Sequence, residues 1–107
     1  MTTRKAQLLQ LLKESPKDVF LNYALALEYL SENDYDHTRL YLEKTLALNE
    51  SYIPAYYQLG MLLAQLQQKE TALQILQKGL KYAQHQKNIK SIAEFQSLIT
   101  HIENELL

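Results

Sequence analysis

Apolar residues along this chain recur three and four positions apart, and short polar segments interrupt them at intervals. The spacing is clearest near the two ends of the chain, in Leu8, Leu11 and Leu12 and in Ile92, Phe95, Ile99, Ile102 and Leu106. Such spacing places apolar side chains on one face of an α-helix. The sequence therefore predicts an all-α protein of about six antiparallel helices joined by short links.

The polar segments between these stripes predict where each helix begins and ends. We expect the first three helices over about 3–14, 16–31 and 35–48. The fourth helix is expected to be capped by Ser51 and to end near Leu66, and the fifth to end near Gln84. Asn88 is expected to cap the last helix. Ser15 can cap the second helix, and Pro16 suits a first helical position because its missing N–H costs little there. Asparagine tolerates the left-handed backbone, so we expect Asn33 to turn the chain before Asp34 caps the third helix.

A longer period also runs through the chain, because residue types recur 34 positions apart. Matching pairs are Tyr23 and Tyr57, Leu25 and Leu59, Ala26 and Gly60, Leu27 and Met61, Leu42 and Leu76, and Leu46 and Leu80. A fixed period of this size is typical of stacked helical hairpins, which bury their apolar faces against one another. We expect a solenoid with a leucine core, in which Ala26, Gly60 and Gly79 mark close helix crossings. The core leucines are Leu25, Leu42, Leu46, Leu59 and Leu76.

Residues 19–52 and 53–86 are similar to two tetratricopeptide repeats. The second segment carries the family pattern in Tyr56, Leu59, Gly60, Ala72, Leu76 and Gly79, and the first carries it in Leu25, Ala26, Tyr29 and Leu42. The chain departs from the pattern at Asn22, Thr38, Thr45, Glu50 and Leu63. The resemblance implies one domain over 1–107, with a half-repeat helix at 1–15, repeats at 19–52 and 53–86, and a capping helix at 88–107. In that last helix, Glu94 stands where a repeat has a small residue.

The resemblance also implies where a partner would bind, because the first helix of each repeat lines the concave surface in this family. The residues placed there are Phe20, Tyr23, Leu27, Leu30, Tyr57, Gln58, Met61 and Gln65, together with Pro54. Helical spacing independently puts the first four on one stripe, beside a second stripe that contains Leu21 and Leu25. A surface helix is not expected to be apolar over so much of its circumference.

Three arrangements would account for the extra stripe. The first helix, the last helix or the neighbouring hairpin could cover it within the chain. Alternatively, it is an exposed groove that takes an amphipathic helix or an extended apolar segment of another protein. In the third arrangement it meets its own copy in a structural homodimer.

The resemblance to small stand-alone tetratricopeptide repeat proteins of bacteria implies a non-catalytic protein–protein interaction module. Some family members hold C-terminal carboxylates with Lys, Asn and Arg side chains in the groove. The corresponding positions here carry Tyr23, Leu27, Tyr57 and Gln58, so a carboxylate would meet no cation. We therefore expect a peptide or helix partner that is recognised through apolar contacts.

Composition and motifs favour no catalytic site, cofactor or metal. Net charge is −1, so no overall field attracts nucleic acid. The chain has no cysteine, its three histidines lie far apart in the sequence, and its two glycines stand alone. No apolar run reaches the roughly eighteen residues of a membrane-spanning helix. The first residues indicate an amphipathic helix rather than an export signal, which makes the cytoplasm the expected location.

Overall fold

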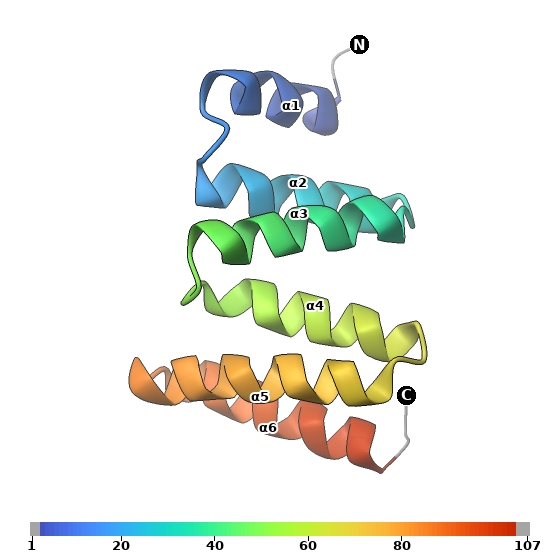
Figure 1. Ribbon diagram of the computed structural model, residues 1–107, viewed down its shortest axis with the longest axis vertical. Helices are drawn as coiled ribbons and strands as arrows, with labels where there is room; N and C mark the ends of the chain where they lie inside the picture. The colour runs from blue at the N-terminus through green and yellow to red at the C-terminus, as the bar shows by residue number, and fades with distance from the viewer. Residues whose placement is uncertain (1–2, 105–107) are drawn as a thin grey trace. The chain divides into compact units, whose positions relative to one another are not determined.

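The computed structural model describes residues 3–104, and this part of the chain is helical apart from its turns (Figure 1). The helices are α1 (Arg4–Glu14), α2 (Val19–Ser31), α3 (Tyr35–Leu48), α4 (Ile53–Gln65), α5 (Lys69–His85) and α6 (Ile89–Glu103). The predicted all-α fold is confirmed. The chain divides into two compact units, residues 1–52 with α1 to α3 and residues 53–107 with α4 to α6. The single-domain organisation and the repeat limits stay predictions.

The start of α2 differs from the prediction, because the helix begins at Val19 and not at Pro16. Asp18 is its N-cap, and a carboxylate oxygen of Asp18 accepts the backbone N–H of Leu21 at 2.9 Å. The buried side-chain amide of Asn22 donates to the carbonyl oxygens of Pro16 and Asp18, at 3.2 and 2.8 Å. These two bonds hold the proline in the turn before the helix. They also give Asn22 a role at a position where the repeat pattern has an aromatic residue.

The two serines expected to cap helices lie outside those positions. Ser15 ends α1, where its backbone N–H donates to the carbonyl of Leu11. Ser51 lies two residues before the first residue of α4, and its hydroxyl donates to the side-chain oxygen of Asn49 at 2.8 Å. The predicted caps Asp34 and Asn88 are confirmed, because each accepts a backbone N–H of its helix through its side chain.

Three helix pairs are joined by the same kind of turn. Asn33, Gln67 and Lys87 each have a left-handed backbone, with φ of 59°, 64° and 56°. In each case the N–H of the next residue reaches a carbonyl five positions back, at 3.0, 2.9 and 2.9 Å. This bond satisfies one of the carbonyls that a helix end leaves without a partner. The first two turns lie 34 residues apart, so the sequence period extends to the backbone.

In the first unit, α1 packs on α2 and α2 packs on α3. Leu8, Ala24 and Leu25 are buried together, with further apolar side chains around them from all three helices. Thr38 and Thr45 are fully buried on α3, at positions where the repeat pattern has alanine. Each threonine hydroxyl donates to a carbonyl four residues earlier in its own helix, at 2.8 and 2.7 Å. The core therefore accepts both threonines without leaving a hydroxyl unsatisfied.

In the second unit, the two glycines lie at close helix crossings, as predicted. A Cβ on Gly60 of α4 would overlap the side chain of Leu76 on α5. A Cβ on Gly79 of α5 would lie 2.6 Å from the Cβ of Tyr56 and 2.7 Å from the Cζ of Phe95. Gly79 is thus the point at which α5 meets both α4 and α6.

The predicted leucine core is buried except at one position. Leu25, Leu42, Leu59 and Leu76 are buried, whereas Leu46 is half-buried. In α6 the expected stripe is also found, because Phe95, Ile99 and Ile102 are buried and Ile92 is half-buried. Leu106, the last residue of that stripe, lies outside the described residues.

Candidate partner-binding site

Half of the predicted groove residues form one face of α2 in the first unit. This α2 face consists of Phe20, Tyr23, Leu27 and Leu30; the side chain of Phe20 is 60% exposed and the others are half-buried. Helix α1 packs on the neighbouring stripe, around Ala24 and Leu25, and none of the four residues belongs to that cluster. Within the first unit, α1 therefore does not cover the α2 face.

The end of the first unit contacts this face at Tyr23. The rings of Tyr23 and Tyr52 lie 5.3 Å apart and are tilted by 59°. Tyr52 follows the turn after α3, so the chain leaving α3 returns to the side of α2 that carries the α2 face. This contact shields part of Tyr23, while Phe20, one helical turn earlier, stays exposed.

The other half of the predicted residues lie on α4 in the second unit. This α4 face consists of Tyr57, Gln58, Met61 and Gln65; Gln65 is exposed and the others are half-buried. The ring of Tyr57 meets the ring of Phe95 edge to face, with centroids 5.7 Å apart and planes at 69°. Helix α6 therefore covers part of the α4 face.

A groove of about 360 Å³ runs between α4 and α6. The residues that line this α4–α6 groove are Tyr57, Ala93, Glu94, Ser97, Leu98 and His101. The five from α6 lie on one side of that helix, since they are spaced one, three or four positions apart. Small side chains at Ala93 and Ser97 keep the groove open, and Tyr57 and Leu98 give it apolar walls.

Reasoning from the sequence found Tyr57 and missed the contribution of α6. A signal was present, because Ala93, Ser97 and His101 recur every four residues on the side of α6 away from its apolar stripe. The sequence predicts a capping helix that packs through its apolar stripe, and this prediction says nothing about the other side of the helix. The structure shows that this other side forms one wall of a groove.

Aromatic and charged side chains gather where α2 turns into α3. The ring of Tyr29 stacks on His37 at 4.7 Å and on Tyr41 at 5.6 Å. Nζ of Lys5 lies 5.2 Å from the centroid of Tyr29 and 2.9 Å from a carboxylate oxygen of Glu32. The bond to Glu32 raises the pKa of Lys5, and burial raises the pKa of Tyr29. This cluster fastens α1 to α2.

Asp34 makes the α2–α3 turn sensitive to acid. Its carboxylate accepts the backbone N–H of His37 at 3.2 Å, and its other oxygen lies 2.8 Å from Nδ1 of the same histidine. The backbone hydrogen bond is the main cause that lowers the pKa of Asp34 from its ordinary value. A carboxyl whose pKa is lower in the folded state stabilises the fold above its unfolded pKa, and this contribution is lost as the pH falls through the folded pKa. We expect Asp34→Asn, which can still cap α3, to lose less stability than the parent protein below about pH 4.

Urea unfolding followed by circular dichroism, at a series of pH values from about 5 to 2, measures this difference. The other carboxyl groups titrate in both proteins, so the comparison isolates position 34. Two curves of unfolding free energy that stay parallel over this range would contradict the assignment.

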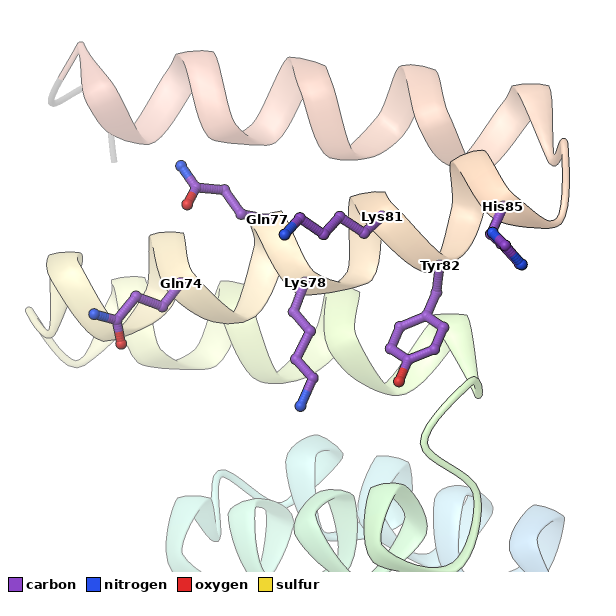
Figure 2. A pocket seen from close by; sticks show the side chains of 6 residues that line it. All are labelled: Gln74, Gln77, Lys78, Lys81, Tyr82 and His85. Atoms are coloured by element: carbon purple, nitrogen blue, oxygen red, sulfur yellow. The ribbon is translucent and has the colours of Figure 1, made fainter.

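A second hollow lies along α5. Its lining residues are Gln74, Gln77, Lys78, Lys81, Tyr82 and His85, and Figure 2 shows their side chains leaving α5 in more than one direction. The ring of Tyr82 stacks on Tyr56 of α4, with centroids 5.5 Å apart. The lysines come from the basic C-terminal half of the sequence. The side chains that line this hollow are therefore polar or basic, although most of the surface that they present to it is apolar, as in the α4–α6 groove.

Among residues 3–104, no three His, Cys, Asp or Glu side chains come close enough together to hold a metal ion. No helix formed by these residues is long and apolar enough to cross a membrane.

The sequence model of the tetratricopeptide repeat family matches residues 29–94, which is more than half of the chain. The match spans both units and reaches into α6. Together with the six helices of residues 3–104, the antiparallel hairpins and the glycines at the helix crossings, this match shows that the chain belongs to the tetratricopeptide repeat family. Proteins of this family are generally non-catalytic modules that bind other proteins.

Solved structures with similar folds come from several organisms. A tetratricopeptide repeat domain protein from Salinibacter ruber is 27% identical; the likeness covers 83% of this chain and 90% of that one, with a TM-score of 0.79. A protein from Bordetella parapertussis is 22% identical over 98% of this chain and 91% of that one, with a TM-score of 0.85.

A third similar structure is the TPR2B domain of yeast Sti1 in a complex with pHsp70. It is 14% identical over 94% of this chain and 81% of that one, with a TM-score of 0.87. At the identities of the Bordetella and yeast proteins, the likeness concerns the fold alone. A search of curated proteins found no match.

Proposed function

We propose that this protein binds a helical or extended apolar segment of a partner protein on the first helices of its hairpins. The main support for the proposal is the α4–α6 groove. Its walls include Tyr57 and Leu98, and the small side chains of Ala93 and Ser97 leave room for a segment of the partner. The α2 face supports it, because Phe20 is 60% exposed. Completing the burial of one such ring would contribute about 1–2 kcal/mol to binding.

The chemistry of these surfaces favours a guest held by apolar contacts. Tyrosine and leucine walls suit apolar anchors, and Tyr is enriched where partners bind tightly. Gln58 and Gln65 on the α4 face offer amide groups that can pair with a guest backbone. The yeast Sti1 domain was solved with a protein partner, which supports partner binding by this fold. We propose that the partner of the present chain is recognised along its side chains and not by a terminal carboxylate.

Filling the α4–α6 groove tests this function without removing a core side chain. Ser97 is exposed and lines the groove, so Ser97→Arg places a long charged side chain where the guest would lie. We expect capture of partners from cell extract to fall about tenfold or more, which corresponds to about 1.4 kcal/mol of lost binding free energy. Captured proteins would be quantified by mass spectrometry.

The matched control is Gln96→Arg, which adds the same side chain at an exposed position that does not line the groove. Both variants should keep the helical circular dichroism and melting temperature of the parent. Equal capture by the two variants would contradict a role for the groove. Loss of capture by both would point to the added charge and not to the blocked site.

Self-association is the competing function, because a second copy could cover the same apolar surface. The exposed ring of Phe20 is the observation that favours it. Sedimentation equilibrium separates the two functions. A species of 12.5 kDa at every concentration would exclude the dimer, whereas a dimer that Ser97→Arg dissociates would assign the α4–α6 groove to the second copy.

A further inference from the structure

We propose that the α4–α6 groove selects partner segments that carry a lysine or arginine beside an apolar anchor, with the cation against Glu94 and the anchor against Tyr57. This inference rests on the proposed function and specifies the chemistry of the guest. It follows from the groove lining, from the charges around it and from the position of Glu94 in the repeat pattern.

The groove is lined by the apolar residues Tyr57 and Leu98 and by one acidic residue, Glu94. Tyr57 is half-buried and presents part of its ring to the groove, whereas Leu98 is 7% exposed and adds little free surface, so Tyr57 provides most of the apolar contact. Glu94 lies four residues before Leu98 on α6, which is one helical turn, so its carboxylate borders the same space. An amphipathic segment that inserts a leucine therefore brings its flanking side chains close to Glu94.

The charges around the groove favour a cationic flank. Glu94 and His101 are the titratable side chains among the α6 residues that line it, and the lining contains no Lys or Arg. Within residues 3–104, Glu94 makes no ion pair. Lys90 lies one turn earlier on α6, but a lysine that precedes a glutamate by four residues is in the less favourable order for pairing. The carboxylate is thus available to a guest.

The repeat pattern explains why a glutamate can occupy this position. Glu94 lies 34 residues after Gly60, and at Gly60 even a Cβ would overlap Leu76 of the next helix. A glutamate could not be accommodated at position 60. At position 94 the side chain is exposed, so a charged group can stand at the edge of the groove.

Three synthetic peptides test the inference. Each peptide is N-acetylated and C-amidated, and it forms an amphipathic helix of alanine and glutamine with leucines along one face. The three peptides differ only in the residue beside the leucine face, which is Arg, Gln or Glu. Binding to the intact protein is followed by NMR through the amide resonances of Ala93, Ser97 and Leu98. An exposed ion pair changes affinity about 1.4- to 5-fold, so we expect the Arg peptide to bind about two to five times more tightly than the Gln peptide. The Glu peptide should bind most weakly.

Two variants on α6 make the test specific. Glu94→Gln should abolish the preference for the Arg peptide, whereas Glu103→Gln removes the same charge from the opposite side of the helix and should preserve it. Raising the salt concentration should reduce the preference in the parent protein, because ions screen exposed charges.

The outcomes separate this inference from the proposed function. Equal binding of the three peptides at the groove amides would overturn the charge preference and leave the groove as a binding site. Failure of every peptide to shift these amides, or shifts confined to other residues, would overturn the inference. Groove amides that shift on dilution without peptide would assign the site to a second copy and also overturn it. The proposed function fails separately, if Ser97→Arg and Gln96→Arg capture partners equally.

Discussion

Leu76→Ala is expected to lower the free energy of unfolding by about 2–5 kcal/mol. Leu76 is fully buried on α5 and contacts α4 at Gly60, where the backbone has no side chain to fill a gap. Truncation therefore removes apolar burial and leaves a cavity that the two helices cannot close without moving. Urea unfolding followed by circular dichroism measures the change.

The same crossing predicts a coupling between two substitutions. Gly60→Ala alone should destabilise the protein, since its Cβ would overlap Cγ and Cδ2 of Leu76, a side chain that is fully buried. In the Leu76→Ala background the added methyl group enters the cavity, so Gly60→Ala should be neutral or stabilising there. Additive effects in this double-mutant cycle would show that the crossing is looser than described. Leu40→Ala, at a side chain that is 44% exposed, is the control and should cost much less.

Gly79→Ala is expected to destabilise the protein by about 1–3 kcal/mol, although alanine is the better helix former. Alanine would by itself favour the helix by about 1 kcal/mol. The new methyl group, however, would lie 2.6 Å from the Cβ of Tyr56 and 2.7 Å from the Cζ of Phe95. The Cβ of Tyr56 is fixed to the backbone of α4, so the helices must separate to make room.

Thermal and urea unfolding of Gly79→Ala would measure this effect. Gln77→Ala, at an exposed position on the same helix, is the control for helix propensity and should change stability by less than about 0.5 kcal/mol. A Gly79→Ala protein more stable than the parent would mean that propensity outweighs the crossing. That result would contradict the account of how α5 meets α4 and α6.

The turns illustrate what local sequence can and cannot predict. Asn33 was expected to turn the chain because asparagine tolerates the left-handed backbone, and its φ is 59°. Gln67 has the same backbone, with φ of 64°, although no local preference indicates it. Gln67 lies one period after Asn33, so the two turns stand at equivalent places in the repeat. The N–H of Gln68 donates to the carbonyl of Leu63 in this conformation, a bond that ends α4 as the equivalent bond ends α2.

The start of α2 shows the opposite case. Ser15 and Pro16 predict that the helix begins at residue 16, whereas in the structure Asp18 is the N-cap and the helix begins at Val19. The deciding interaction is the buried amide of Asn22, which donates to the carbonyl of Pro16. Burial of that amide depends on how α2 packs, so the position of the cap could not be obtained from local preferences.

The candidate site was predicted in part. The 34-residue pairing of Tyr23 with Tyr57 indicated which sides of α2 and α4 would carry aromatic residues. It did not indicate that Phe95 of α6 lies against Tyr57, nor that Glu94 and Ser97 line a groove beside it. Helical spacing describes each helix by itself, whereas a groove depends on the orientation of two helices that are distant in the sequence.

The sequence by itself determined the helices, their 34-residue repetition and the small residues at their crossings, because these follow from local periodicity and from the space that Gly60 and Gly79 leave. Tertiary structure alone decided which apolar residues are covered. Phe20 stays exposed while Tyr57 gains an aromatic neighbour from α6, although both lie on predicted groove stripes. The physical reason is that burial is a property of pairs of surfaces, and the partner surface is specified by packing and not by the spacing of residues within one helix.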